Sequence, residues 1–515
     1  MKKIKAILAL ILVAALFVTL FAACAKDNTN ANTNTNTNTS TNDKPVDPDE
    51  IVNIRVSYLD VLGKKDAHER IEAAMNEISE KEIGVHCDLV YWGMGEYVTQ
   101  AGLALAGGEQ IDAVNVIPML TFTAMQSNTY LMEAKEIYET YCKEAMEGLG
   151  QYAYAYSIDG GLYGLPNNRI LSNSPFVVMR KDVLDACNLV DAARAADSWS
   201  DVEKIWAGVA DYCKDNNLAV IAGQKTIGFF TTLWAGDEFS SAIAYENLAD
   251  GTATIGVFND KVECIWEKTE LKDYMKRVNT WGENGWIWPD TVLGEQHTDT
   301  LMKQGVMFCY LNNGELDIEA QKAEATGYEV VAIQTANGIV SNKQLGTFGI
   351  SITSTCEDPI ATAKWINLLY TNPKMSTLLS WGVEGEDFVL NENGEAMYPD
   401  NDPDKAAYHE PDYMMGNQMI VPPWVGNGGD FRERAKADNA AAPLSPYLGL
   451  MVDLSGLDTI VASLTNVKEE YYPRIVCGEY SDALQKEFVD KLYTVGLQDY
   501  IDALQAQVDA FVASK

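Results

Sequence analysis

Histidine is scarce in this chain, which has four among its 515 residues. None of them stands in an HExxH pattern or at another spacing that would place two ligands on one metal. The sequence also lacks the GxSxG turn of serine hydrolases and the GxxxxGK[ST] loop that holds nucleotide phosphates. A zinc protease, a serine hydrolase and a P-loop ATPase are therefore excluded, and we expect no cofactor.

The strongest candidate for a metal site is the acidic segment 400–411. Asp400, Asp402 and Asp404 occupy the first, third and fifth positions of a calcium-binding loop. Such a loop also needs Gly at position six and Glu at position twelve, and this segment has neither. We therefore expect no bound metal.

Basic residues are in deficit. The chain has 38 Lys and Arg against 74 Asp and Glu, which gives a formal net charge of −36. A nucleic-acid partner would require a stripe of Lys and Arg to neutralise phosphates, and the sequence offers none. The acidity is typical of a solvated surface, although it also permits a cationic ligand.

Paired cysteines are lacking as well, because no CxxC pair occurs after the N-terminal region. A zinc ribbon and a redox-active pair are therefore excluded. Most of these cysteines lie among apolar residues, which predicts buried thiols, while disulfides stay open for an exported chain. The eight are Cys87, Cys142, Cys187, Cys213, Cys264, Cys309, Cys356 and Cys477.

The N-terminus has three lysines in its first five residues, followed by an apolar run to residue 23. The run ends in the letters FAAC, and small residues before Cys24 resemble the lipobox of bacterial lipoproteins. We therefore predict a signal peptide at residues 1–23 and lipidation of Cys24. An uncleaved transmembrane anchor is the alternative, because the run is just long enough to span a bilayer.

Residues 24–50 form a low-complexity tract of Asn and Thr. Such a segment cannot bury enough surface to offset the entropy of ordering, so it is predicted to be a disordered tether. A flexible coil of about 26 residues reaches about 30 Å. We expect the folded part to be held, by lipid, at the outer face of a bacterial cytoplasmic membrane.

Strand and helix patterns alternate after the tether. Apolar residues alternate with polar ones at 51–60, and strand patterns return at 85–92 and 111–117. A helix is expected between each pair, the second at about 97–106. This alternation predicts an α/β fold with a parallel sheet, in which ligands bind beyond the carboxyl ends of the strands.

The stretch DGGLYGLPNN, residues 159–168, separates a helical region from the strand pattern SPFVVMR at 174–180. Its glycines and proline predict a turn. Asn167 and Asn168 follow, and their amides can both donate to and accept from hydroxyl groups. They are predicted either to contact a ligand or to bond the neighbouring backbone.

Several phrases stand in an order that resembles the extracellular solute-binding proteins of ABC importers. They include DGGLYGLPNN, FVVMRKDVLDACNL, SWSDVEKIW, GTFGISITSTCEDPIATAKWINLLYTNPKMSTLL and WGVEGEDF. The chain is most similar to the long lipoprotein branch of the sugar-binding family (family 1-like). That branch ends in an extra, uncharacterised C-terminal region, matched here from about Gly382.

The resemblance implies a two-lobe α/β fold of the periplasmic-binding-protein-like type II, with hinge crossovers and a ligand cleft between the lobes. On this scheme lobe 1 comprises 51–173 and 336–390. Lobe 2 comprises 174–335 and 391–515, including the C-terminal helical region. The stretch at 159–168 then leads into the first crossover, at the junction of the lobes.

The resemblance further implies that a monomer captures a carbohydrate, in particular an oligosaccharide, by closure of the lobes and delivers it to ABC permease subunits. Aromatic rings suit the faces of sugars, while Asn, Asp and Glu suit their hydroxyl groups. The predicted ligand-binding residues are Tyr58, Trp92, Asn115, Asn167, Asn168, Trp234, Asp237, Trp286, Tyr310, Asn312, Asn313, Phe348, Trp381 and Glu384.

Three alternatives stay open. The same fold could bind a peptide, an amino acid or a polyamine. An exported glycoside hydrolase would need two carboxylates around the sugar, which Asp237 with Glu238 or the acidic residues at 384–387 could supply. A sensory lipoprotein would bind sugar but signal to a kinase. We favour binding for transport and expect no enzymatic activity.

Overall fold

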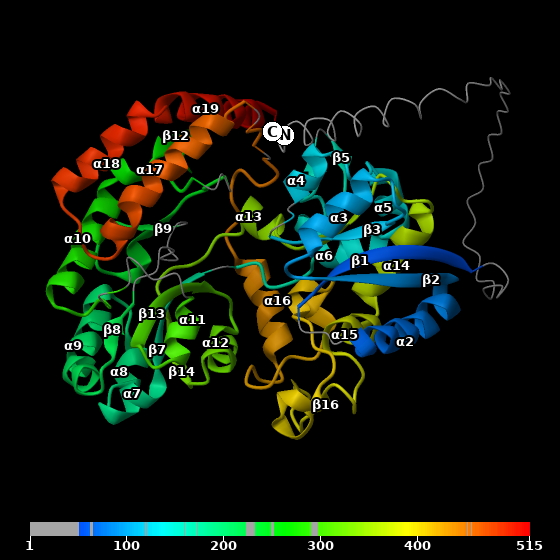
Figure 1. The fold of residues 1–515 in the computed structure, drawn as a ribbon, viewed down its shortest axis with the longest axis horizontal. Coiled ribbons are helices and arrows are strands. Elements are labelled where there is room, and N and C mark those ends of the chain that lie inside the picture. The colour runs from blue at the N-terminus through cyan, green and yellow to red at the C-terminus, as the bar shows by residue number, and fades with distance from the viewer. Residues whose placement is uncertain are drawn as a thin grey trace, which may run out of the picture. The chain divides into compact units, whose positions relative to one another are not determined.

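The structure is a computed structural model. It describes residues 51–514 except 62–64, 119, 121, 159, 173, 223–231, 249–251, 289, 291–296, 451 and 455. The predicted signal peptide, Cys24 and the predicted tether lie outside the described residues. Within the described part, the longer strands form two sheets (Figure 1), and no helix is both long and apolar enough to cross a membrane.

The first sheet has five strands in the order β2-β1-β3-β15-β6. β1 pairs in parallel with β2 and with β3, whereas β15 runs antiparallel to both of its neighbours. The predicted parallel arrangement of the first three strands is therefore confirmed. The strands are β1 (Val52–Asp60), β2 (Val85–Gly93), β3 (Ala113–Val116), β6 (Leu165–Pro166) and β15 (Gly349–Ile352).

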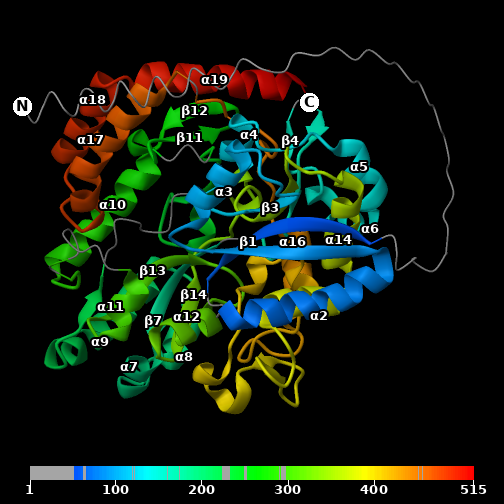
Figure 2. The same cartoon turned by 45° about the vertical axis from the view of Figure 1, so that its right-hand side comes forward.

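Helices from two distant parts of the chain pack around this sheet and form the first lobe. α2 lies beside β2 (Figure 2) and also contacts α14 and α15. Ile54, Val56, Ile71 and Trp365 are fully buried in the core that results, called the first core below. The helices are α2 (Lys65–Ile83), α3 (Tyr97–Ala106), α4 (Phe122–Ser127), α5 (Lys135–Tyr141), α6 (Lys143–Leu149), α14 (Pro359–Thr371) and α15 (Pro373–Trp381).

The second sheet has four strands in the order β14-β7-β13-β8 and belongs to the second lobe. β7 runs antiparallel to β13 and to β14, and every one of its residues is buried. A continuous apolar strand such as SPFVVMR is typical of a position covered on both faces. The strands are β7 (Ser174–Arg180), β8 (Ala219–Ile221), β13 (Met307–Gly314) and β14 (Val330–Gln334).

The second core is rich in tryptophan, with Trp199, Trp206, Trp266 and Trp281 all buried. The C-terminal helices α17, α18 and α19 pack on it beside α10 and β12 (Figure 1). The helices of this lobe are α7 (Lys181–Ala186), α8 (Val190–Ala195), α9 (Trp199–Asp215), α10 (Thr269–Glu283), α11 (Thr298–Lys303), α12 (Ile318–Thr326), α17 (Asp458–Val476), α18 (Asp482–Thr494) and α19 (Leu497–Ser514).

Four short hairpins complete the strands of the described part. They pair β4 (Ser157–Ile158) with β5 (Gly161–Leu162), β9 (Thr232–Trp234) with β10 (Ala242–Ala244), β11 (Ile255–Phe258) with β12 (Lys261–Cys264), and β16 (Val389–Leu390) with β17 (Ala396–Met397).

The chain passes from the first sheet to the second at residues 167–173 and returns at 335–348. The returning segment contains the short helix α13 (Asn342–Leu345). A capping box between Ser341 and Gln344 lies at the start of this helix. α16 (Phe431–Ala441) is bonded to the first passage, because Asn439 contacts the backbone of Arg169 and of Leu171.

The predicted lobe boundaries stay a prediction. One segment assigned to lobe 2 by the sequence scheme packs on the first core. Tyr408, Met414 and Met415 are buried in the first core, although the sequence scheme assigns them to lobe 2. The amide of Asn417 donates to the carbonyl of Tyr370 in α14, which fixes this segment against the first lobe. The region after Gly382 is therefore divided between the two cores.

Gly164, in the glycine-rich stretch, packs directly against β15. A Cβ at this position would lie 2.8 Å from the carbonyl oxygen of Ile350 and 2.9 Å from the ring of Tyr156, and closer still to the hydroxyl of Ser351. Gly164→Ala is therefore expected to lower the free energy of unfolding by about 2–3 kcal/mol. Urea denaturation measures the change.

The matched control for Gly164 is Gly95→Ala, because a Cβ at Gly95 has no atom within 4 Å. The control should change the free energy of unfolding by less than about 0.5 kcal/mol. Equal stabilities of the two variants would mean that β15 moves to accept the extra carbon.

Candidate functional site

A cavity of about 430 Å³ lies between α12 and residues 409–432. α12 belongs to the second lobe, while Met414, next to the lining residue Tyr413, is buried in the first core. We therefore call it the interlobe cavity. Its lining residues are Asp299, Asp317, Ala320, Gln321, Lys322, Glu324, Ala325, Trp381, His409, Pro411, Asp412, Tyr413, Trp424, Asn427, Phe431 and Arg432.

One wall of the interlobe cavity is aromatic. The ring centroid of Trp424 lies 4.9 Å from that of Trp381, 4.5 Å from that of His409 and 4.8 Å from that of Tyr398. The indole nitrogen of Trp381 donates to the carbonyl of Pro422 at 3.0 Å, which fixes the orientation of its ring. This wall offers flat apolar faces with polar edges to a ligand.

The aromatic wall carries no charge at neutral pH. Burial lowers the pKa of His409 to about 4, because the protonated imidazole would lose its hydration. The neutral ring instead packs 4.7 Å from Trp381 and 5.2 Å from Tyr398, centroid to centroid. His409 therefore contributes aromatic surface rather than a cation.

The two cationic side chains in the lining are both paired with carboxylates. Lys322 Nζ lies 3.0 Å from an oxygen of Asp299. Arg432 is buried, and its Nη2 donates to Asp412. Neither cation is left as an isolated positive charge toward the cavity.

Two buried polar atoms of the lining have no protein partner among the described residues. Asp317 accepts a hydrogen bond from Gln321 on one oxygen, at 2.8 Å, but its Oδ1 is unpartnered. Arg432 donates from Nε to the carbonyl of Val421 at 2.8 Å, but its Nη1 is unpartnered. A buried unpaired polar group costs about 1–3 kcal/mol. Both atoms are buried from solvent, so a ligand would reach them only after the lining rearranges.

Asp317 is a carboxylate at neutral pH despite its burial. Loss of hydration raises its pKa to about 6, and the nearby Asp412 adds to the effect, while Gln321 and Arg432 oppose it. Above that pH the side chain is mainly ionised. Because its Oδ1 is buried from solvent, Asp317 acts on a ligand in the cavity through its charge.

Trp381 is the predicted ligand-binding residue that lines the interlobe cavity. Tyr310 is buried behind the wall, and its hydroxyl donates to Asp299 at 2.5 Å. Tyr310 therefore positions a lining residue instead of facing a ligand. Glu384 is exposed and lines a different, mostly apolar cavity of about 670 Å³, formed within residues 373–432.

The side chain of Asn167, a predicted ligand contact, is hydrogen-bonded to other residues of the protein. Asn167 is buried, its Nδ2 donates to the carbonyl of Tyr413 at 3.1 Å, and its Oδ1 accepts from Tyr370 at 3.0 Å. Asn168 is half-buried, with its backbone bonded to Gly416 and Gln418. The Asn pair therefore joins the crossing segment to the first lobe.

Arg169, the next residue, bridges the two lobes. Its Nη1 lies 2.7 Å from Glu315 at the end of β13 and its Nη2 donates to the carbonyl of Gln344 at 2.9 Å. The guanidinium lies 5.3 Å from the ring centroid of Phe348, a predicted site residue, which also packs against Tyr413. Phe348 thus supports the crossing and lies outside the cavity lining.

Three predicted contacts are buried in the cores, and the structure gives them a packing role. Tyr58 lies in the first core because β1 continues beyond it to Asp60. Trp234 lies in the second core, stacked on Tyr274. Asn115 is fully buried in β3, and its amide donates to the carbonyl of Gly349 at 3.1 Å.

The remaining predicted residues are half-buried and do not line the interlobe cavity. Trp92 packs near Tyr97 and Trp286 packs on the second core. Asp237 forms an ion pair with Arg277 at 2.8 Å. Asn312 and Asn313 lie near the end of β13, opposite Phe176 and Pro175 of β7. For all the residues named in this paragraph as predicted contacts, binding to a ligand stays a prediction.

Three of the carboxylates considered for a glycoside hydrolase, Asp237, Glu386 and Asp387, have structural partners. Besides the ion pair of Asp237, both oxygens of the buried Asp387 accept from Arg70, at 2.7 and 2.8 Å. Glu386 lies 3.1 Å from the same guanidinium. These three carboxylates are engaged by arginine side chains, and none of them lines the interlobe cavity.

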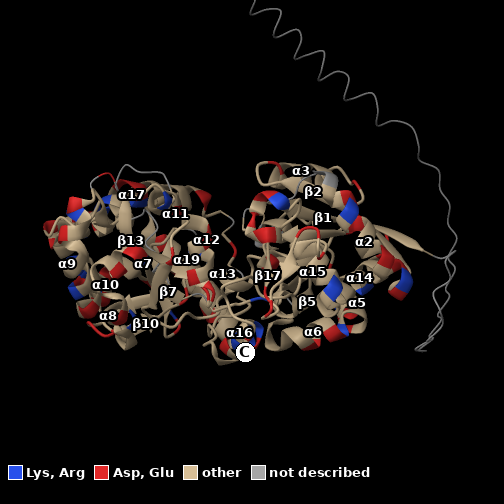
Figure 3. Ribbon diagram, turned by 90° about the horizontal axis from the view of Figure 1, so that it is seen from below, with Lys and Arg blue, Asp and Glu red and all other residues tan. Residues whose placement is uncertain are grey.

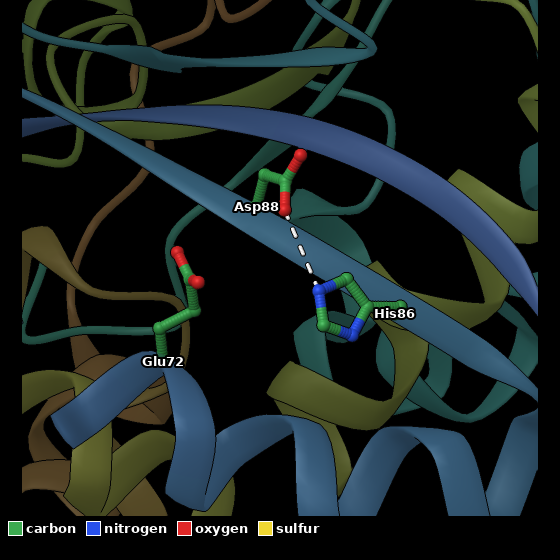
Figure 4. A group of neighbouring side chains, drawn as sticks. All are labelled: Glu72, His86 and Asp88. Atoms are coloured by element: carbon green, nitrogen blue, oxygen red, sulfur yellow. Dashed lines mark ion pairs between the residues drawn. The ribbon is translucent and has the colours of Figure 1, made fainter. Parts of the chain in front are cut away.

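Figure 4 shows three neighbouring side chains of types that can hold a metal ion; none of them lines the interlobe cavity. His86 and Asp88 come from β2 and Glu72 from α2. His86 Nδ1 lies 2.6 Å from Glu80 and its Nε2 lies 3.4 Å from Asp88, while Glu72 accepts from the backbone amide of Leu89. Each of these groups therefore already has a protein partner.

Sequence reasoning missed Asp317, Trp424 and Arg432. Trp424 follows two prolines and precedes a glycine-rich run, a pattern that indicates a tryptophan held in a loop. Asp317 directly precedes α12 and Arg432 lies in the first turn of α16, so each has the pattern of an ordinary helix start. Nothing local marks these two residues as ligand contacts.

Comparison with known proteins identifies the class of the chain. Residues 73–382 match the family model described as bacterial extracellular solute-binding protein, and residues 446–513 match a domain of unknown function. A carbohydrate ABC transporter substrate-binding protein of Streptococcus pneumoniae is 22% identical over 481 residues, which are 92% of each chain.

Two solved structures have a similar fold. The N-glycan transport solute-binding protein of Streptococcus pneumoniae has a TM-score of 0.76 at 18% identity, and the match covers 89% of this chain and 99% of that one. An extracellular solute-binding protein from Bifidobacterium longum subsp. infantis has a TM-score of 0.62 at 14% identity, covering 90% and 99%. The predicted two-lobe α/β fold is therefore confirmed.

Proposed function

Because the chain belongs to the bacterial extracellular solute-binding proteins, we propose that it captures an oligosaccharide in the interlobe cavity and delivers it to an ABC permease. The observation that carries this proposal is the composition of the cavity wall. Trp381 and Trp424 line it with aromatic surface, and Gln321, Glu324 and Asn427 line it with polar side chains. Sugars present both kinds of surface.

The names of similar proteins support a carbohydrate over a peptide or a polyamine. One relative is described as a carbohydrate ABC transporter protein, and a similar structure is that of an N-glycan transport protein. The fold alone would fit each of these ligand classes. The aromatic wall of the interlobe cavity is a further reason to favour a carbohydrate, and it comes from this chain rather than from similar proteins.

Capture would occur by closure of the two lobes. Asp317 and Lys322 belong to the second lobe, while Pro411 and Tyr413 belong to the segment that packs on the first. A ligand that touches both sides binds the closed state better than the open one. It therefore shifts the equilibrium toward closure by that difference in affinity.

We further propose that the mature chain is a monomer, anchored through lipidated Cys24 at the outer face of the cytoplasmic membrane, and that it has no enzymatic activity. The FAAC sequence supports the anchor. The ion pairs of Asp237 and Asp387 support binding without catalysis. Energy for transport would come from a separate ATPase.

A thermal-shift panel tests the proposal. Oligosaccharides should raise the melting temperature of the purified chain, whereas peptides, amino acids and polyamines should leave it unchanged. If only a peptide or an amine stabilised the protein, the carbohydrate assignment would be abandoned. Release of dye from a chromogenic glycoside would contradict the expected lack of catalysis.

A further inference from the structure

The interlobe cavity has an excess of negative charge in its lining. The lining contains four carboxylates, from Asp299, Asp317, Glu324 and Asp412, and two cations, from Lys322 and Arg432. Each cation is paired with one carboxylate, as described above. Asp317 and Glu324 are left without a cation among the lining residues.

Neither of these two carboxylates forms an ion pair among the described residues, although Arg432 favours the ionised form of Asp317. Asp317 is bonded to the uncharged amide of Gln321, and its second oxygen is free. Glu324 is exposed and interacts with the hydroxyl of Tyr398, which is also uncharged. The aromatic wall adds no cation, because His409 is neutral.

Two helix N-termini provide a partial positive charge, but not enough to reverse this balance. α12 begins next to Asp317 and α16 begins with the lining residue Phe431. A helix N-terminus is equivalent to about half a positive charge, so two of them offset about one carboxylate. Besides Glu324, α12 carries one further acidic residue, Glu319, which is paired with Arg194 and adds no unmatched charge (acidic positions are red in Figure 3).

From this balance we infer that the cavity selects oligosaccharides without acidic groups and excludes those with carboxylate, sulfate or phosphate substituents. The inference rests on the proposed function. A neutral sugar can bond polar side chains of the lining, such as Gln321, Glu324 and Asn427, without adding a charge. An acidic substituent would instead place a second negative charge beside Asp317.

The size of the effect follows from Coulomb's law. Two like charges about 6 Å apart, at an effective dielectric constant of about 20, reduce affinity on the order of a hundredfold. Salt screens part of this repulsion where the site is open to solvent. We therefore expect a discrimination of at least about tenfold at low salt, decreasing as salt is added.

The test begins with the full-length chain, purified in detergent, on a glycan array. The array holds neutral gluco-, manno-, galacto- and N-acetylglucosamine oligosaccharides together with uronate and sialylated ones. The glycan that binds best should be neutral. If the best glycan is acidic, the inference is overturned while the proposed function stands. If no glycan binds, both are overturned.

Calorimetry then compares the best neutral glycan with two derivatives. In one, the primary hydroxyl groups are oxidised to carboxylates; in the other, the same positions are carboxamides, which have a similar size without the charge. The carboxylate form should bind at least about tenfold more weakly than the carboxamide form. Equal affinity of the two derivatives, or loss of binding by both, would contradict a charge-based selection.

A double variant, Asp317→Asn with Glu324→Gln, removes the two unmatched charges. The ratio of carboxamide to carboxylate affinity should then approach one, whatever happens to the affinity for the neutral glycan. Asp191→Asn, an exposed carboxylate on α8, is the matched control and should leave the ratio unchanged. If the double variant retained the original ratio, these residues would not be the origin of the selection.

Discussion

At pH 9, Arg169→Ala is expected to lower the free energy of unfolding by about 3 kcal/mol. The guanidinium is buried, forms the 2.7 Å ion pair with Glu315, and donates to the backbone carbonyls of Ile170 and Gln344. Its removal leaves two buried carbonyl groups and one buried carboxyl group without their donor. Urea denaturation at fixed pH measures the loss.

The loss should be smaller at pH 6, at about 2 kcal/mol. Burial raises the pKa of Glu315 to about 8, helped by Asp317 and Asp412 and opposed by Arg169. A carboxyl with a raised pKa stabilises the folded state fully below its unfolded pKa, near 4.3, and loses this contribution as pH rises through 8. Without Arg169 the folded pKa rises further, so the difference between variant and parent grows above pH 8.

Two variants make this prediction specific. Glu315→Gln in the Arg169→Ala background should remove the extra pH dependence, because no carboxyl is left to ionise. Arg194→Ala breaks a similar ion pair, with Glu319, that is largely exposed, and should cost less than about 1 kcal/mol at both pH values. If the loss of unfolding free energy in Arg169→Ala did not change with pH, Glu315 would not be the residue that Arg169 stabilises.

Trp424→Ala is expected to weaken oligosaccharide binding by roughly 30-fold, which corresponds to about 2 kcal/mol. The indole lines the interlobe cavity and is held by Trp381, His409 and Tyr398. Alanine removes the face on which a sugar ring would stack, and leaves a space that water fills. Calorimetric titration with the best glycan of the array measures the change.

Trp288→Ala is the matched control for Trp424, because this indole is also half-buried but packs in the second lobe on the cluster that contains Val178 and Met307. It should lower the melting temperature without changing the dissociation constant. If Trp288→Ala weakened binding and Trp424→Ala did not, the ligand would lie elsewhere in the second lobe, and the interlobe cavity would not be the site.

Local patterns predicted the first half of the first sheet well. The strands at β1, β2 and β3 and the helix at 97–106 follow from alternation and from the glycines after the helix, which are local signals. β15 could not be placed in the same way. It pairs with β3 through Gly349 opposite Val116, a contact between residues far apart in the chain.

The candidate site was less predictable, because it is assembled from segments that meet only in the folded chain. Trp381 was predicted as an aromatic residue near a loop, and it does line the cavity. Tyr58 was predicted by the same reasoning, but β1 runs on past it and buries it. Whether an aromatic residue near a strand end is exposed depends on the elements that cover it, which periodicity does not reveal.

The position of β15 has a consequence for the order in which the exported chain folds. The second sheet is built from strands between residues 174 and 334, so it is complete once that stretch has emerged. The first sheet needs β15 between β3 and β6, and residues 167–348 must appear before it can close. During secretion, the N-terminal lobe should therefore wait, with an open sheet edge, for a strand that arrives after its neighbour has formed.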